Sequence, residues 1–390
     1  MRKDAWKGAP VSAVFENLLP DNLSVRQRVA EKTGAAGSDA WSLLEEIGRD
    51  CIGAMQFLHE DSNQSQDRSL RAEEITDGEI EKLLAGLARA PLGMEADEEF
   101  RISVAGAQEK TALLRLDGKW LRPLGITPTT HLLKPQLGEI PTASGVIDMT
   151  ASVDNEHYCL TLLQEFGLEV ASTSIETFGE RRVLVVERFD RLWRDDGSII
   201  RRPQEDCCQA LGIPPARKYE SEGGPSAISI LKLLQGADDP IRDQMAFFKC
   251  QILFWMIGAT DGHGKNFSIY LDPGGRFAMT PIYDVLSAQP AFDEKQIPNN
   301  RYKVAMAVGD NRKYRIQEIS GRHFMQTGKQ AGLSEKLMRD TFSEVLDRHA
   351  EALERAAERM PPDFHGPIHE SVSRAVRANV PLLQAGLTDA

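Results

Sequence analysis

The first hundred residues have the apolar–polar pattern of short helices. Residues 11–60 are predicted to be helical and compact, with a turn at residues 20–22 and Ser24 in position to cap the helix that follows. Residues 61–78 are polar and rich in serine and aspartate, which predicts a linker or an exposed loop. A further helix is predicted over residues 77–88.

Strand-like runs dominate from residue 100 onward. The string FRISVAGAQEKTALLRL (100–116) holds two such runs around a loop of small residues, and residues 120–121, 131–134 and 183–189 predict further strands. The stretch between Lys134 and Asn155 is rich in proline, glycine and threonine, which predicts mostly loop. Residues 155–166 have helical periodicity, and Gly167 is a suitable helix end.

The second half of the chain is mainly helical. A helix is predicted over residues 239–257, with Pro240 in its first turn and its end near Gly258, and its apolar residues on all sides predict a core helix. Asp-Pro-Gly-Gly (272–275) joins two short strands, and residues 334–359 predict a long amphipathic helix. The whole pattern is that of an α+β protein, a mixed β/α part followed by an α-rich part.

Composition and charge exclude several classes of protein. A chain of 390 residues with 41% hydrophobic residues has the length of two to three domains and can bury a core. The net charge of −12 argues against a stand-alone nucleic-acid binder. The 5 cysteines are odd in number and lack metal-ligand spacing, so a reducing cytoplasm is expected. No membrane span is expected, because the longest apolar stretch, residues 247–259, is too short and is interrupted. No signal peptide is expected, because the N-terminal MRKDAWKGAP has no apolar h-region.

The most informative segment is GATDGHGKNFSIYL (258–271). Asp261 and Asn266 have the spacing D-x-x-x-x-N of a protein-kinase catalytic loop, in which the aspartate handles the substrate hydroxyl proton and the asparagine holds magnesium. Asp284 follows the predicted hairpin, where kinases place a second metal-binding aspartate. The alternative is a flexible Asp/Gly turn, since this spacing alone also arises by chance.

Phosphoryl transfer also needs cationic and backbone donors for the triphosphate. Lys134 ends a strand run and is the natural counterpart of the kinase strand lysine, with Glu156 on the next helix as its partner; the alternative is a solvent-facing lysine. Residues 103–110 are rich in small residues and are predicted to form a loop that drapes N–H groups over phosphates, or else an ordinary loop. Residues 187–189 end a buried strand where a kinase hinge would lie, and Phe189 would pack on adenine or simply in the core.

These residues stand in strings that resemble the HipA family of serine/threonine kinases, the toxins of bacterial toxin–antitoxin pairs. The resemblance covers about residues 11–380. It rests on ENLLPDN (16–22), ISVAGAQEKTALL (102–114), GITPTTHLLK (125–134), SVDNEHYCL (152–160), VERFDR (186–191), PQEDCCQALG (203–212), KYESEGGP (218–225), GATDGHGKNFS (258–268) and TPIYDVLSA (280–288).

The resemblance implies a two-lobed, protein-kinase-like α+β fold that uses ATP and Mg²⁺. It implies Asp261 as the catalytic aspartate, Asn266 and Asp284 as magnesium ligands, and Ser103 as a serine whose autophosphorylation switches the kinase off. The implied nucleotide-binding residues are Ala105, Gly106, Ala107, Gln108, Glu109, Lys110, Lys134, Glu187, Arg188, Phe189, Gln204, His263, Gly264, Lys265, Asn266, Tyr283 and Asp284.

The resemblance also implies partners and a domain order. The implied target is the glutamate–tRNA ligase, whose modification stalls translation and arrests growth. The implied partner is a HipB-like helix-turn-helix antitoxin, which carries the kinase to operator DNA as a co-repressor. Expected domains are residues 1–98 as a remnant of the N-terminal HipA subdomain, 99–192 as the kinase N-lobe and 193–390 as the helical C-lobe. Full-length members begin with a β-rich subdomain, so this chain is expected to be shortened or its start misassigned, and some relatives supply that piece as a separate small protein.

Two other functions remain open from the sequence. One is a catalytically silent co-repressor that bridges antitoxin on DNA, which the presence of Lys134, Asp261, Asn266 and Asp284 disfavours. The other is a small-molecule phosphotransferase on the same fold, because fold alone does not decide the substrate.

Overall fold

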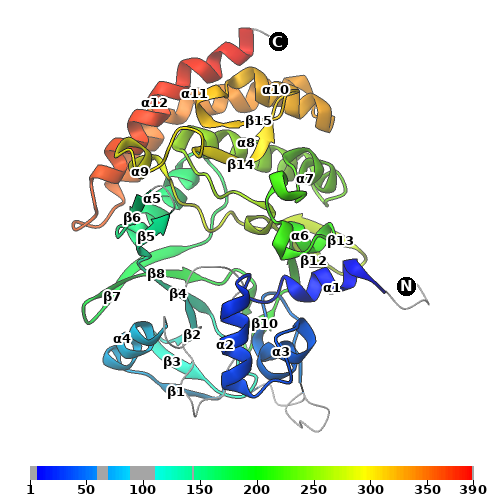
Figure 1. Ribbon diagram of the computed structural model, residues 1–390, viewed down its shortest axis with the longest axis vertical. Coiled ribbons are helices and arrows are strands. Elements are labelled where there is room, and N and C mark those ends of the chain that lie inside the picture. Colours follow the sequence, from blue (N-terminus) through cyan, green and yellow to red (C-terminus); the bar gives the residue numbers. More distant parts are fainter. Residues whose placement is uncertain (1–6, 59–68, 88–109, 143–144, 389–390) are drawn as a thin grey trace. The chain divides into compact units, whose positions relative to one another are not determined.

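The computed structural model describes residues 7–58, 69–87, 110–142 and 145–388 (Figure 1). The chain divides into two compact units. The first unit comprises Met1–Gln136 and Ser172–Ala216, and the second comprises Leu137–Ala171 and Arg217–Ala390. The domain boundaries expected after residues 98 and 192 stay predictions.

The first unit opens with three short helices, as the sequence predicts. They are α1 (Ala9–Glu16), α2 (Leu23–Thr33) and α3 (Ala40–Ile47), and they share a core that includes Leu19, Leu43 and Ile47. The predicted cap of α2 is wrong, because the Asn22 side chain accepts a hydrogen bond from the backbone N–H of Ser24. An asparagine outside the helix reaches the free N–H groups of the first turn, which a serine already inside it does not.

A six-stranded antiparallel sheet forms the rest of the first unit's core. Its strand order is β1-β3-β2-β4-β8-β7. Helix α4 (Asp77–Gly86) packs on it through Ile80, Leu83 and Leu84, close to the range predicted for it. The strands are β1 (Ala72–Glu74), β2 (Thr111–Leu116), β3 (Lys119–Pro123), β4 (His131–Pro135), β7 (Thr173–Phe178) and β8 (Arg181–Glu187).

Strand β1 corrects the prediction that residues 61–78 are a loop. Its sequence, AEE, carries no strand signal, and the strand exists because residues 72–74 pair with residues 121–123 of β3. The first strand-like run of residues 100–109 lies outside the described residues. After β8 come β9 (Arg191–Trp193), β10 (Ile199–Arg201), β11 (Gln204–Asp206) and the short helix α6 (Cys207–Ala210).

The second unit contains a hairpin that the sequence did not predict. Residues expected to be mostly loop form β5 (Gly138–Thr142) and β6 (Gly145–Met149), which pair with each other. The prediction failed because proline and glycine are frequent here, and both are tolerated in a two-stranded ribbon without a central strand. Two further hairpins are β12 (Ser268–Asp272) with β13 (Arg276–Met279), as predicted, and β14 (Lys303–Val308) with β15 (Lys313–Arg315).

Helices make up most of the second unit (Figure 1). Helix α8 has Pro240 at its start and ends at Gly258, whose φ of 71° is left-handed and favours glycine. Residues 247–257 of α8 are all buried, so the predicted core helix is confirmed. The helices are α5 (Ser152–Glu165), α7 (Ala227–Leu234), α8 (Pro240–Ile257), α9 (Gln289–Asp293), α10 (Gly321–Ala331), α11 (Glu335–Glu358) and α12 (Pro367–Thr388). Within the described ranges, no helix has the length and apolar character needed to cross a membrane.

Candidate active site

The predicted catalytic loop leaves the buried end of α8 and is pinned to the segment that carries Asp284. The backbone N–H of Ala288 donates to the carbonyl of Gly258 at 2.9 Å, at the point where the loop begins. The Ser287 hydroxyl donates to the carbonyl of Ile257 at 2.5 Å. Two backbone segments 30 residues apart are therefore held together at the base of the loop.

Asn155 of α5 completes this base. Its Nδ2 donates to the Ser287 carbonyl at 2.9 Å, and its Oδ1 accepts from the Ser287 backbone N–H at 2.8 Å. Asn155 and Ser287 are both buried. Neither residue was predicted to belong to the site, because their pairing across 132 positions leaves no local signal in the sequence.

Asp261 lies in the exposed part of the loop. The Tyr219 hydroxyl donates to its Oδ1 at 2.5 Å, and the Nε2 of His263 lies 3.9 Å from its Oδ2. The side chain of Asp261 is 64% exposed, whereas that of His263 is 7% exposed. Among the described residues, Tyr219 makes the one short hydrogen bond to this carboxylate, and the rest of the side chain is open to a substrate.

Position 262, next to Asp261, requires glycine because the loop runs against the core there. A Cβ on Gly262 would lie 2.4 Å from Cδ2 of the Phe254 ring, which is far inside van der Waals contact. The next residues, Gly264–Asn266, form a single 3₁₀ turn that leads into β12. This tight path turns Asn266 inward, where it is only 2% exposed.

Asn266 and Asp284 are joined directly. The Nδ2 of Asn266 donates to the carbonyl and to Oδ2 of Asp284, each at 3.2 Å. Asp284 has a φ of 60°, a left-handed conformation that aspartate tolerates better than most residues and that is typical of functional turns. With Nδ2 committed to Asp284, Oδ1 of Asn266 is buried and has no hydrogen-bond partner among the described residues.

Tyr283 and Lys265 belong to the same arrangement. The Tyr283 hydroxyl donates to the Lys265 carbonyl at 2.7 Å and lies 2.6 Å from the Ser268 hydroxyl. The second unit thus brings together the predicted residues Asp261, His263, Gly264, Lys265, Asn266, Tyr283 and Asp284.

The other predicted residues belong to the first unit. Lys134 is buried in β4, where it pairs with Leu184 of β8. Gln204 is also buried, and its Oε1 has no hydrogen-bond partner among the described residues. Lys110 is buried just before β2. Ser103 and residues 105–109 of the predicted phosphate loop lie outside the described residues.

Residues 187–189 end β8 as the sequence predicts. Glu187 is exposed, Phe189 is half-buried and Arg188 is buried. The backbone N–H groups of Glu187 and Arg188 donate to the carbonyls of Ser172 and Thr130, both at 2.9 Å. The Arg188 guanidinium donates to Asp190 at 2.8 Å and to the Thr129 hydroxyl at 2.9 Å. The Arg188 side chain is therefore engaged in contacts inside the first unit.

Arg188 is part of a buried ionic cluster that the sequence analysis did not find. The cluster holds three arginines and two carboxylates: Arg188, Arg191, Arg201, Asp50 and Asp190. Burial by itself raises the pKa of Asp50, but Arg191, Arg188 and Arg201 outweigh it and hold the pKa well below its usual range. Burial together with neighbouring Arg188 lowers the pKa of Arg191 to about 10. The cluster ties the end of the N-terminal helices to the turn after β8.

The site's donor set fits a magnesium ion bound together with phosphates. Mg²⁺ takes oxygen ligands and is held at such sites by one or two protein groups plus the phosphates of the nucleotide. The free Oδ1 of Asn266 and the carboxylate of Asp284 are ligands of that kind, and their mutual hydrogen bond orients both. In the described parts of the chain, no group of three or more His, Cys, Asp or Glu side chains is arranged to hold a metal.

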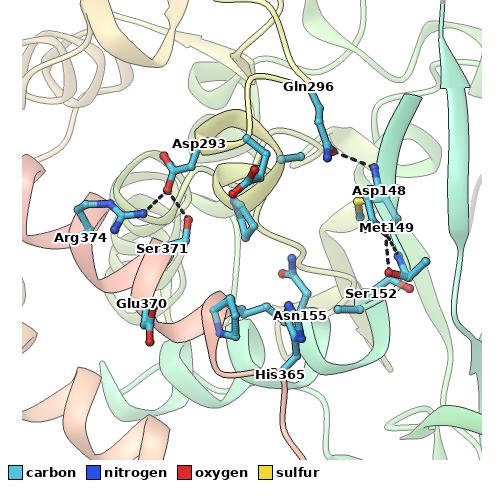
Figure 2. A pocket seen from close by; sticks show the side chains of 17 residues that line it. Asp148, Met149, Ser152, Asn155, Asp293, Gln296, His365, Glu370, Ser371 and Arg374 are labelled. Carbon is cyan, nitrogen blue, oxygen red and sulfur yellow. Dashed lines mark hydrogen bonds and ion pairs between the residues drawn. The ribbon is translucent and has the colours of Figure 1, made fainter. Parts of the chain in front are cut away.

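A separate pocket of about 490 Å³ lies elsewhere in the second unit (Figure 2). It is lined by residues that include Asp148, Asn155, Asp293, Glu370 and Arg374, and by none of the predicted site residues. Glu370 stands in the first turn of α12, where acids stabilise the helix dipole, and Asp293 pairs with Arg374 at 2.7 Å. Glu370 and the Asp293–Arg374 pair therefore have structural explanations.

Comparisons with known proteins agree on one family. Residues 102–353 match the family model described as the HipA-like C-terminal domain, and residues 1–58 match the HipA N-terminal domain. The Sinorhizobium fredii protein Y4mE is 34% identical over 348 residues, which are 88% of this chain and 78% of that protein. The serine/threonine-protein kinase toxin HipA of Shewanella oneidensis is 27% identical over 314 residues, 77% of this chain and 67% of the toxin.

A solved structure shares the fold. A chain in the complex of HipA, HipB and operator DNA from Shewanella oneidensis superposes with a TM-score of 0.78 at 23% identity. The match covers 98% of this chain and 88% of that one.

Proposed function

This chain belongs to the HipA family and has its kinase-like α+β fold, and we propose that it is an ATP- and Mg²⁺-dependent kinase that phosphorylates serine or threonine in a protein. The observation that carries the proposal is the pairing of Asn266, which lies on the same loop as Asp261, with Asp284 of the segment after β13. It leaves a buried amide oxygen and a carboxylate side by side, which a structural turn does not need.

In this proposal each part of the site has a separate task. Asp261 accepts the proton of the substrate hydroxyl as the hydroxyl oxygen attacks the γ-phosphorus and the bond to the leaving ADP oxygen breaks. Asn266 and Asp284 would hold Mg²⁺, which when bound neutralises charge on the phosphates. Lys134 and the loop of residues 105–110 contact the phosphates. Residues 187–189 meet adenine, and Gln204, His263, Lys265 and Tyr283 line the nucleotide site.

The proposal extends to the biological role. The chain acts as the toxin of a toxin–antitoxin pair with a HipB-like antitoxin, and it reaches operator DNA through that partner. Support comes from a family relative named a kinase toxin and from a fold relative solved with HipB and operator DNA. The net charge of −12 is consistent with DNA contact made mainly by the partner. The proposed target is the glutamate–tRNA ligase, and autophosphorylation of Ser103 is the proposed off-switch.

The first experiment is the intact mass of the purified chain before and after incubation with Mg²⁺ and ATP. A gain of one phosphate on Ser103 is expected, and Asp261→Asn should abolish the gain while ATP still binds. Ser103→Ala should remove the phosphate and leave the kinase active toward protein substrates. An Asp261→Asn variant that gains phosphate at the wild-type rate would refute the assignment of Asp261.

The two alternatives give other results. A chain that binds antitoxin and DNA but transfers no phosphate, starting from verified unphosphorylated protein, is a silent co-repressor. Turnover of ATP on small alcohols without protein labelling marks a small-molecule phosphotransferase.

A further inference from the structure

We propose that Tyr219 is a positioning residue that holds the carboxylate of Asp261 in its reactive orientation. This inference rests on the proposed function, because it concerns the same carboxylate. The Tyr219 hydroxyl donates to Oδ1 of Asp261 at 2.5 Å across 42 positions of the sequence. The string KYESEGGP (218–225) is part of the family resemblance, which assigns Tyr219 no chemical task.

Asp261 needs such a support because its side chain is exposed. At 64% exposure, the protein's packing does not fix the rotation of the carboxylate. A reacting group that is free to rotate loses much of the advantage of proximity, since small misplacements reduce the rate strongly. A hydrogen bond to Oδ1 leaves Oδ2, on the side of His263, to meet the substrate hydroxyl.

Tyr219 is itself held by contacts to its ring and to the adjacent backbone. Its ring meets the buried ring of His263 edge to face, with centroids 5.0 Å apart, and Lys218 Nζ lies 5.5 Å from the Tyr219 ring centroid. The carbonyl of Lys218 accepts from the backbone N–H of Gly264 at 3.2 Å. The tyrosine and the catalytic loop are therefore tied by backbone as well as by side chains.

Glu220 and Gly224 fix the rest of this segment. The Glu220 carboxylate accepts from the backbone N–H of Ala307 in β14 at 2.6 Å and pairs with Arg312 at 3.1 Å. The backbone N–H of Gly224 donates to the carbonyl of Tyr219 at 2.9 Å. A Cβ on Gly224 would lie 2.2 Å from the carbonyl oxygen of Arg217, so only glycine permits this turn. Residues 218–224 thus form a rigid support for one phenol hydroxyl.

Tyr219→Phe tests the inference, because it removes the hydroxyl and keeps the ring contact with His263. The assay is the first-order rate of phosphate incorporation into the full-length chain by intact mass, measured across a range of Mg-ATP concentrations. A hydrogen bond to a charged acceptor accounts for about a tenfold change. We expect the maximal rate to fall about tenfold, with the half-saturating ATP concentration within about twofold of wild type and the melting temperature unchanged.

Tyr158→Phe is the matched control. It removes a hydroxyl that bonds the His369 Nδ1 at 2.8 Å in the same unit, outside the proposed site, and its transfer rate should equal that of wild type. A second variant, Tyr219→Ala, removes the ring as well and should transfer phosphate more slowly than Tyr219→Phe.

The outcomes distinguish a failure of this inference from a failure of the proposed function. A Tyr219→Phe variant with the wild-type rate overturns the inference when Asp261→Asn is inactive, and the proposed function then stands. A Tyr219→Phe variant with weaker ATP affinity and a lower melting temperature as well as a lower rate overturns it too, because the tyrosine is then only structural. An Asp261→Asn variant as active as wild type overturns both.

Discussion

Replacing Asp50 by asparagine should destabilise the first unit severely, because this side chain is the centre of a buried ionic cluster. Asp50 is fully buried and lies just after α3, far in sequence from its partners. Its Oδ2 accepts from the backbone N–H and the hydroxyl of Thr129, at 3.0 and 2.8 Å. Its Oδ1 accepts from Arg191 and Arg201, both at 3.0 Å.

The expected loss follows from the charge that remains. The cluster has three arginines and two carboxylates, so it carries one excess positive charge, and neutralising Asp50 raises the excess to two. Breaking a buried pair from one side costs about 3 to 5 kcal/mol, because a charge is left buried without compensation. Asparagine keeps one acceptor oxygen, so we expect about 3 kcal/mol. That is a large share of the roughly 5 to 15 kcal/mol that stabilises a typical protein.

The measurement is native-state hydrogen exchange on the full-length chain, together with urea unfolding. Exchange is resolved by segment, which matters because two compact units need not unfold as one. Protection should fall first in the peptides around Thr129 and Arg188, whose backbone groups adjoin the cluster. The matched control is Asp196→Asn in an exposed turn, where Asp196 accepts from the backbone N–H and the hydroxyl of Ser198, and it should leave the urea midpoint unchanged.

A small effect would contradict this reasoning. If Asp50→Asn unfolds within about 1 kcal/mol of wild type and keeps its protection around Thr129, then the cluster is solvated or rearranges without cost. The double variant Asp50→Asn with Arg201→Gln adds a further check. It removes one charge of each sign, so it should be more stable than the sum of the two single losses predicts.

Two further predictions concern packing and pH. Gly262→Ala should cost about 1 to 3 kcal/mol and slow phosphate transfer, because its Cβ would lie 2.4 Å from the Phe254 ring. Gly78→Ala, in helix α4 with nothing within 4 Å, should not lower the melting temperature and is expected to raise it slightly. Burial, with a smaller contribution from Arg115, lowers the pKa of His131 to about 4. The unfolded chain therefore binds a proton between pH 6.5 and 4 that the folded chain excludes, and stability falls as the pH is lowered through this window. His131→Gln should remove about 1 kcal/mol of that loss at pH 5, after allowance for partial exposure. The prediction is disproved if the free energy of unfolding changes equally with pH between 6.5 and 4 in the variant and in wild type.

The sequence predicted those elements whose cause is local. Helix α8 was found because its proline start, glycine end and apolar run all lie within twenty positions, and the β12–β13 hairpin because its turn is Asp-Pro-Gly-Gly. Asp261 and Asn266 lie within a single loop, so their spacing alone was enough to predict the candidate catalytic residue. The HipA strings extended that reading to the family, which the family models confirm.

The misses have a common physical origin in long-range pairing. Strand β1 has a polar sequence and exists because β3 offers it an edge, and the β5–β6 ribbon is stabilised by its own cross-strand pairs despite glycine and proline. A window of sequence contains neither partner strand. Propensity therefore predicted loops in both places.

The amino-acid sequence alone was enough to predict the α+β class, the core helix and the side chains proposed for phosphoryl transfer. How those groups are supported follows from the complete fold: Tyr219 is hydrogen-bonded to Asp261, Asn266 to Asp284 and Asn155 to Ser287, and Asp50 lies among three arginines. Such contacts join residues from 18 to 141 positions apart. Their energy depends on burial and on directions that the completed fold alone sets, so no local pattern of residues encodes them.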